Sequence, residues 1–133
     1  MALRLRNVLL VDDDCMTNYI NQIILEESGM FDKVDIAETA VEALDKIENQ
    51  TDMNRPEIIF LDINMPGLNG WDFVAEYNLY VNRSNKKAAI IMLTSSNSPD
   101  DKIKAVYAKG VTGYINKPLT ADKLMDAIGK YLH

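Results

Sequence analysis

The alternation of short apolar segments with longer amphipathic segments is the feature that most constrains the fold of this chain. Apolar runs of strand length occupy residues 7–11, 34–37, 57–61, 88–93 and 113–116. Each run is followed by a segment in which apolar residues recur at helical spacing. Five strands that alternate with five helices through right-handed crossovers form a parallel sheet with helices on both faces. We therefore predict an α/β fold with one five-stranded parallel sheet.

The length of the chain favours one domain with one core. A chain of 133 residues, 47% of them apolar and 26% charged, has the balance of a folded globular protein and is too short for two ordinary domains. We predict a single domain over residues 1–133, with its core between about residues 7 and 132. The leading candidate at this length is the flavodoxin-like (βα)5 three-layer sandwich, with strand order 2-1-3-4-5.

Several residues predict where helices begin and end. Gly29 suits the C′ position of the first helix, and Thr39 is predicted to cap the second. The polar stretch 82–87 is predicted to be the loop after the third helix. Pro99 fits the first turn of a fourth helix, which Gly110 would close.

Charge and composition argue against several functions. Fourteen basic residues against twenty acidic ones give a net charge of −6, which disfavours a nucleic-acid-binding surface. No apolar run approaches the roughly 20 residues of a membrane helix, and the N-terminus lacks the apolar core of a signal peptide, so we expect a cytoplasmic protein. The single cysteine, Cys15, permits no internal disulfide and is expected to pack as a small apolar residue. The single histidine is the last residue, so chemistry that needs a histidine must borrow one from another protein.

Polar side chains follow four of the five predicted strands. Three aspartates, Asp12 to Asp14, end the first strand, and Asp62 ends the third. Thr94 ends the fourth strand and Lys117 the fifth. The carboxyl ends of parallel strands lie at one edge of the sheet, where the switch in strand order opens a crevice. We therefore expect carboxylates, a hydroxyl and an ammonium around one pocket.

The crowding of carboxylates predicts a bound cation. Two like charges about 4 Å apart repel by about 4 kcal/mol at an effective dielectric constant of about 20. Such a pocket must hold a cation or raise the pKa of a carboxyl group. Oxygen ligands without histidine or cysteine favour Mg²⁺. A carboxylate beside Mg²⁺ can attack phosphorus, and Lys117 and Thr94 could then pair with phosphoryl oxygens.

Four sequence blocks contain the residues at the strand ends. The blocks are Val11-Asp12-Asp13-Asp14, Leu61-Asp62-Ile63-Asn64-Met65-Pro66-Gly67 with Gly70, Leu93-Thr94-Ser95, and Gly113-Tyr114-Ile115-Asn116-Lys117-Pro118-Leu119. They resemble the signature motifs of the response-regulator receiver domains of two-component signalling systems, in particular the chemotaxis-regulator-like members. The blocks occur in the order and approximate spacing of that family, and the resemblance extends from about residue 7 to residue 132.

The resemblance implies a role for each acidic residue. Asp62 would be the phospho-acceptor, and Asp13 would bind Mg²⁺ directly. Asp12 would act largely through water, and the main-chain carbonyl of Asn64 would complete the protein ligands. Asp14, by contrast, is expected to turn away from the pocket and cap the following helix.

The resemblance also implies a switch. Thr94 and Tyr114 would form the switch pair, and Lys117 would pair with the phosphoryl group on Asp62. The Lys117–Pro118 peptide would be cis. The surface formed by the fourth helix, the fifth strand and the fifth helix would then change its preference for a downstream protein target.

The expected function is that of a stand-alone response regulator and not of an enzyme. A sensor histidine kinase or a histidine phosphotransfer protein would supply the phosphoryl group, and the chain would catalyse only its own phosphorylation and dephosphorylation. A role as a phosphorelay intermediate is an alternative. A phosphatase of the haloacid-dehalogenase type is disfavoured, because Asn64 replaces the second aspartate of the Asp-x-Asp motif. The remaining alternative is an interaction module that is never phosphorylated.

Overall fold

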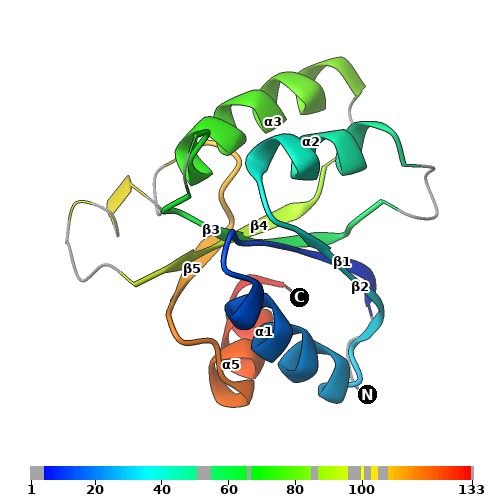
Figure 1. Ribbon diagram of the computed structural model, residues 1–133, viewed down its shortest axis with the longest axis vertical. Coiled ribbons are helices and arrows are strands. Elements are labelled where there is room, and N and C mark those ends of the chain that lie inside the picture. The colour runs from blue at the N-terminus through cyan, green and yellow to red at the C-terminus, as the bar shows by residue number, and fades with distance from the viewer. Residues whose placement is uncertain are drawn as a thin grey trace.

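The computed structural model contains one five-stranded parallel sheet with helices on both faces (Figure 1). The strand order is β2-β1-β3-β4-β5, so the predicted fold class and strand order are confirmed. The described residues are 5–50, 55–65, 67–84, 87–95, 100, 103–104 and 108–132, with residue 6 described by its backbone alone. The strands are β1 (Leu5–Val11), β2 (Phe31–Ala37), β3 (Ile58–Asp62), β4 (Ala89–Thr94) and β5 (Gly113–Asn116). The helices are α1 (Cys15–Glu27), α2 (Ala40–Glu48), α3 (Gly70–Ser84) and α5 (Ala121–Tyr131).

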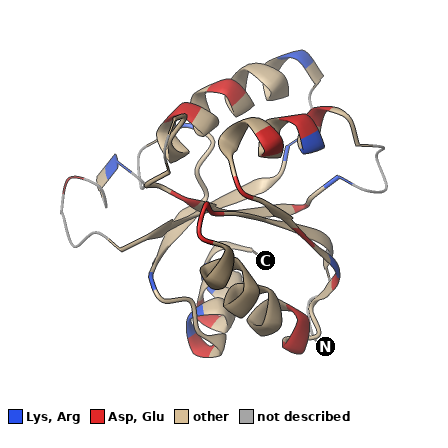
Figure 2. Ribbon diagram, viewed as in Figure 1, with Lys and Arg blue, Asp and Glu red and all other residues tan. Residues whose placement is uncertain are grey.

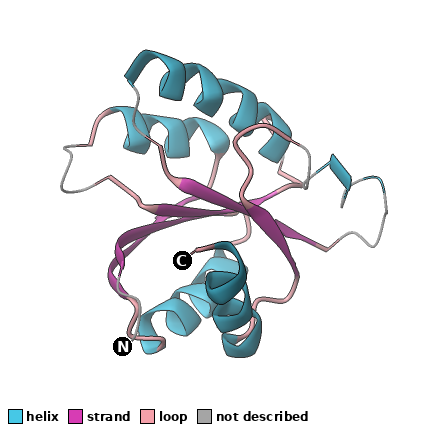
Figure 3. Ribbon diagram, turned by 180° about the vertical axis from the view of Figure 1, so that it is seen from behind, coloured by secondary structure: helices cyan, strands magenta, loops and turns pink. Residues whose placement is uncertain are grey.

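The central strands are buried on both faces of the sheet. β3 is buried along its whole length, and charged residues lie on the helices and near strand ends (Figure 2). Alternate residues of a strand point to opposite faces. Leu9 and Val11 pack under α2 and α3, whereas Val8 and Leu10 pack with α1 and α5, and Figure 3 shows both helix layers from behind. Burial on two sides explains why these strands are nearly continuous runs of Val, Ile and Leu.

Local caps define the predicted helix ends. Thr39 caps α2, because its hydroxyl oxygen accepts a hydrogen bond from the Glu42 N–H at 3.0 Å. Asp14 caps α1 by accepting a bond from the Met16 N–H at 3.2 Å. Gly29 follows α1 with a φ of 72°, in the left-handed region that favours glycine. The predictions for Thr39, Asp14 and Gly29 are therefore confirmed.

The predicted loop over residues 82–87 is wrong in its first half. α3 continues to Ser84, whose hydroxyl donates to a main-chain carbonyl one turn earlier at 2.8 Å. Arg83 is exposed and lies 3.3 Å from Glu48 of α2. Polar residues thus form the solvent-facing side of the last helical turn, which a polarity pattern does not distinguish from a loop. Residues 85–86 lie outside the described part of the chain.

The buried face of α1 differs from the apolar stripe that its sequence presents. Ile20 and Ile23 are 49% and 39% exposed, respectively. The buried residues of this helix are Asn18, Asn21 and Leu25. Two asparagines therefore face the sheet where the 3.6-residue periodicity would place apolar side chains.

The predicted fourth helix falls largely outside the described residues, including its first residue, Pro99. Ile103 and Lys104 are helical, and the Ala108 N–H donates to the Lys104 carbonyl at 2.8 Å. Gly110 has a φ of 92°, as suits a residue that ends a helix.

Two expectations from the composition can be compared with the structure. No helix in the described part of the chain combines the length and apolar character needed to cross a membrane. Cys15 is exposed at the first position of α1, so the expectation that it packs as an apolar residue is wrong.

Candidate phosphoacceptor and metal site

The strand register brings the predicted site residues to one edge of the sheet. Val11 of β1 is level with Leu61 of β3, so the aspartates that follow these two residues are neighbours. Asp62 pairs with Leu93 of β4, which Thr94 follows. Thr94 in turn pairs with the residue that precedes Lys117. The predicted pocket at the carboxyl ends of β1, β3, β4 and β5 is therefore present.

Three carboxylates form a cluster at this edge. One carboxylate oxygen from each of Asp12, Asp13 and Asp62 lies within 4.8 Å of the other two. Asp12 and Asp62 are only 2% and 4% exposed, whereas Asp13 is exposed. Asp14 is not in the cluster and instead caps α1, as predicted. Figure 2 shows the acidic segments that meet where β1 turns into α1.

Lys117 lies between the two buried carboxylates. Its Nζ is 3.0 Å from Oδ2 of Asp12 and 3.1 Å from Oδ1 of Asp62. The ammonium is itself mostly buried, which strengthens both contacts relative to a surface pair. The cluster nevertheless has three carboxylates and only two of them contact the ammonium, so negative charge remains in excess.

The pKa values of Asp62 and Lys117 reflect this arrangement. Burial is the main reason that the pKa of Asp62 is raised, and the charge of Asp12 raises it further. The contact with Lys117 opposes this shift without cancelling it. Burial alone would lower the pKa of Lys117, but the bonds to Asp12 and the charge of Asp62 outweigh burial and raise that pKa. Lys117 therefore stays charged, whereas ionisation of the Asp62 carboxyl group costs free energy in the folded protein.

The loop that carries Lys117 is anchored by α5. The Lys123 ammonium donates to the main-chain carbonyls of Asn116 and Pro118, at 2.9 and 3.0 Å. These two carbonyls flank Lys117, whose own N–H donates to the Thr94 carbonyl at 2.8 Å. The Lys117–Pro118 peptide is cis, as predicted. Lys123 was not singled out from the sequence, because one lysine in a helix gives no sign that it will bind carbonyls.

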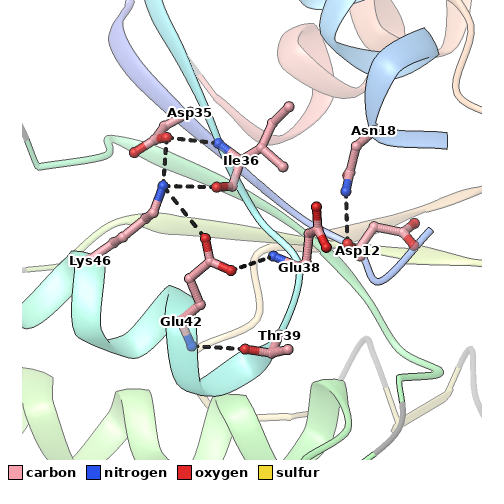
Figure 4. Close-up of polar contacts among 8 residues, drawn as sticks. All are labelled: Asp12, Asn18, Asp35, Ile36, Glu38, Thr39, Glu42 and Lys46. Carbon is pink, nitrogen blue, oxygen red and sulfur yellow. Dashed lines mark hydrogen bonds and ion pairs between the residues drawn. The ribbon is translucent and has the colours of Figure 1, made fainter. Parts of the chain in front are cut away.

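Asn18 is a second residue at the site that the sequence did not reveal. It reaches from α1 to the start of the β1–α1 turn, where its Nδ2 donates to the main-chain oxygen of Asp12 at 2.7 Å (Figure 4). Within the sequence, only the polar side chain of Asn18 in a helical segment indicated such a role, and the nearby apolar Ile20 was the stronger candidate for the buried face of this helix.

The same view shows Lys46 of α2, which bonds Asp35 of β2 at 2.8 Å and so connects the edge strand to the helix that follows it.

Gly70 allows α3 to begin directly against the end of β3. Its N–H donates to the Ile63 carbonyl at 2.9 Å. A Cβ at this position would lie 2.7 Å from the Asp62 carbonyl oxygen and 2.8 Å from the Cα of Ile63. Both atoms belong to the backbone and cannot rotate away, so only glycine fits without a shift of β3 or α3.

The remaining predicted residues lie around the cluster. Thr94 is buried at the end of β4, and Tyr114 is half-buried on β5. Asn64 is exposed, and its N–H donates to Oδ1 of Asp62 at 3.3 Å. The roles of Thr94 and Tyr114 in switching, and of the Asn64 carbonyl in metal binding, stay predictions.

Comparison with known proteins identifies the family. The family model described as the response regulator receiver domain matches residues 8–129 of the chain. The chain belongs to the response-regulator receiver family. The resemblance of its four sequence blocks is thereby confirmed, and CheY-like members of this family are phosphorylated on an aspartate.

Similar receiver domains occur both alone and within larger proteins. The chain is 36% identical to the chemotaxis protein CheY of Halobacterium salinarum, an alignment that covers 96% of this chain and 97% of that protein. It is 32% identical to part of the sensor histidine kinase AruS of Pseudomonas aeruginosa, with 92% of this chain but 12% of that protein covered. A crystal structure of a two-component response regulator from Cytophaga hutchinsonii superposes with a TM-score of 0.87 at 32% identity, covering 97% of this chain and 98% of the other.

The acidic cluster fits the metal that receiver domains bind. The three converging groups are all carboxylates, and the described residues add no imidazole or thiolate ligand to the cluster. Hard oxygen ligands with excess negative charge suit Mg²⁺ and not Zn²⁺. Asp12, Asp13 and Asp62 are therefore the side chains that would hold the ion.

Proposed function

We propose that this receiver domain accepts a phosphoryl group from a phosphohistidine on a partner protein onto Asp62, in an Mg²⁺-dependent reaction in the cytoplasm. The observation that carries this proposal is the position of Asp62 at the end of β3. Its carboxylate lies 3.1 Å from the Lys117 ammonium and within the acidic cluster, so one aspartate has both a cation partner and a potential metal neighbour.

Three residues of this chain have distinct roles in the proposed phosphoryl transfer. An Asp62 oxygen attacks phosphorus and forms the new O–P bond, while the P–N bond to the partner histidine breaks. The bonding electron pair stays on the imidazole nitrogen. The ring leaves as neutral imidazole when the phosphohistidine is protonated, and otherwise it takes up a proton from water. Lys117 pairs with one phosphoryl oxygen, and the Thr94 hydroxyl donates to another. Bound Mg²⁺ would neutralise charge on the phosphoryl oxygens.

The proposed donor is a phosphohistidine on a histidine kinase or a histidine phosphotransfer protein. Receiver domains interact with histidine kinases, and relatives of this chain include receiver segments of such kinases. The exposed apolar face of α1 supports a protein donor, since α1 begins directly beside the cluster. Its exposed members are Met16, Tyr19, Ile20 and Ile23.

The proposed output is a change in the protein-binding surface. Tyr114 lies on β5, two residues before the residue that Thr94 pairs with, and it packs against the core beneath α3. Together with residues of α5, Tyr114 lines a surface hollow of about 190 Å³. Phosphorylation at Asp62 would bias the position of Thr94 and, through it, of Tyr114. A downstream protein would then read the surface of the fourth helix, β5 and α5.

The phospho-acceptor can be tested with a small-molecule donor. Acetyl phosphate and Mg²⁺ should add the mass of one phosphoryl group to the wild-type chain, as measured by intact-mass spectrometry. Asp62→Asn should abolish this addition. Asp14→Asn is the matched control, because it removes a carboxylate two residues from Asp12 that caps α1 and lies outside the cluster, and asparagine also caps helices. Labelling that persists in Asp62→Asn would disprove the assignment.

We further propose that the domain is a switch and does not turn over external phosphoesters. Asn64 supplies no second carboxylate to act on a leaving group. Steady hydrolysis of p-nitrophenyl phosphate by the wild type, lost in Asp62→Asn, would favour a phosphatase instead.

A further inference from the structure

The end of β1 leaves a main-chain carbonyl that needs a hydrogen-bond donor. The Asp12 N–H still follows the sheet pattern, because it donates to the Ala37 carbonyl of β2 at 3.1 Å. Beyond Asp12 the chain leaves the sheet and turns into α1. A buried carbonyl at such a turn requires a donor from elsewhere in the molecule. Asn18, which is 2% exposed, supplies it at 2.7 Å.

We propose that Asn18 is a positioning residue that sets the Mg²⁺ affinity of the acidic cluster. The carbonyl that it binds belongs to the peptide that joins Asp12 to Asp13. Fixing the plane of this peptide fixes the directions in which the two aspartate side chains leave the backbone. Asn18 thus acts on two of the three carboxylates through one hydrogen bond, without touching either carboxylate. The inference rests on the proposed function only in assuming that the cluster binds Mg²⁺.

Other contacts of Asp12 depend on the same peptide. Oδ1 of Asp12 accepts a bond from the Asp14 N–H at 3.0 Å, and Oδ2 contacts Lys117 at 3.0 Å. Both contacts require one orientation of the Asp12 backbone. The Asn18 N–H, by donating to the Asp14 carbonyl at 3.0 Å, closes the first turn of α1. The side chain and backbone of Asn18 therefore hold the whole β1–α1 turn.

The chemistry of the position argues against a purely structural role. The orientation of the amide is set by its partner, since only the NH₂ group can face a carbonyl oxygen. Its Oδ1 is buried and has no hydrogen-bond partner within the described part of the chain. Asparagine is a poorer helix former than leucine, so helix stability alone would not select it at this position. The contribution of the amide that the structure shows is its hydrogen bond to the Asp12 carbonyl.

Magnesium titration of the purified full-length chain tests the inference. Isothermal titration of metal-free protein with MgCl₂ would compare the wild type with Asn18→Leu, which keeps the approximate shape but removes the donor. We expect the dissociation constant to rise about 10-fold, as is typical when a residue that orients a metal ligand is lost. Asn21→Leu is the matched control, because Asn21 is buried on the same face of α1, one turn further on. Its affinity should stay within about 2-fold of the wild type.

A second measurement does not depend on a variant that folds. In NMR spectra of the wild-type protein, the side-chain NH₂ of Asn18 should exchange slowly with solvent and shift when Mg²⁺ is added, whereas that of Asn21 should shift less. Equal affinity of Asn18→Leu and the wild type, or an Asn18 amide that does not respond to Mg²⁺, would overturn the inference. A wild type that binds no Mg²⁺ would overturn the proposed metal dependence as well, so the two failures are distinguishable.

Discussion

At the level of single residues, the site contains fewer positive charges than carboxylates. Asp12 and Asp62 are buried and share one ammonium, that of Lys117, while Asp13 adds a third carboxylate from the solvent side. Removing a charge from this cluster should therefore stabilise the metal-free protein, even though the same change destroys its proposed chemistry. The charge of Asp62 thus lowers the stability of the metal-free protein but is required for the proposed phosphoryl transfer.

The pH dependence of stability should reveal the cost of the Asp62 charge. Because burial raises the pKa of Asp62, the folded protein retains this proton to a higher pH than the unfolded chain, whose aspartates titrate at about 3.9. The contribution of Asp62 to stability therefore falls as the pH rises from this value through the folded pKa, and the loss is complete above it. In EDTA at pH 7.5, we expect Asp62→Asn to be more stable than the wild type by about 1 kcal/mol.

Urea unfolding at several pH values would measure this difference. It should shrink as the pH falls below about 3.9, where the carboxyl group becomes protonated in both states. If Asp62→Asn were instead less stable at pH 7.5, the attraction to Lys117 would have to exceed the costs of burial and of the Asp12 charge.

At the scale of secondary-structure elements, the site depends on how closely two helices approach the sheet. α3 begins against the backbone of Asp62, and α1 begins beside the cluster and turns two asparagines inward. The rotation of α1 also leaves its isoleucine face exposed beside the phospho-acceptor edge.

Gly70→Ala should displace the start of α3. The added Cβ would meet the backbone at Asp62, so we expect a loss of about 2 kcal/mol in the free energy of unfolding and slower labelling by acetyl phosphate. Gly129→Ala is the control, because Gly129 is in α5 and, in the described part of the chain, its added Cβ would have no atom within 4 Å beyond its neighbours and the backbone of its own helix. This control should be more stable than the wild type by about 0.5 kcal/mol. Urea midpoints that are equal for Gly70→Ala and the wild type would contradict the proposed close approach.

The exposed face of α1 should matter only for a protein donor. Ile20→Asp should slow transfer from a phosphorylated histidine phosphotransfer protein by about 10-fold, the effect of losing one well-packed interface side chain. Labelling by acetyl phosphate should not change. Val41→Asp is the control, since Val41 is an exposed apolar residue of α2, on the opposite face of the sheet. Equal slowing by both variants in a radiolabel transfer assay would show that net charge, and not this face, is responsible.

At the scale of the whole molecule, the parallel sheet links metal binding to folding. The three carboxylates come from the turn after β1 and from the end of β3, so they meet only in the folded state. A ligand that binds only the folded state stabilises it by mass action.

Mg²⁺ should therefore raise the melting temperature. At ten times its dissociation constant, the expected stabilisation is about 1.4 kcal/mol, or roughly 3–6 °C for a domain of this size. EDTA should reverse the shift, and Asp13→Asn should reduce it. Melting curves that are the same with Mg²⁺ and with EDTA would contradict metal binding at the cluster.

The strands and their ends could be predicted from the sequence because the information is local. A run such as residues 57–61 has the composition of a strand buried on both faces, and the residue after it must lie at the edge of the sheet. Parallel topology then brings Asp12, Asp62, Thr94 and Lys117 together without further assumptions. The fold, the strand order and the convergence of these side chains were accordingly predictable.

The rotation of α1 and the groups that hold the backbone of the site depend on how the helices pack against the sheet. The periodicity of α1 favoured burial of Ile20 and Ile23, but the helix begins at a cap and a turn that direct Asn18 toward the Asp12 carbonyl. Likewise, the bonds from Lys123 to the carbonyls around Lys117 depend on where α5 packs. The sequence pattern shows which side chains are apolar. It does not show which main-chain carbonyls lack a hydrogen-bond donor, because that depends on where the folded chain leaves the sheet.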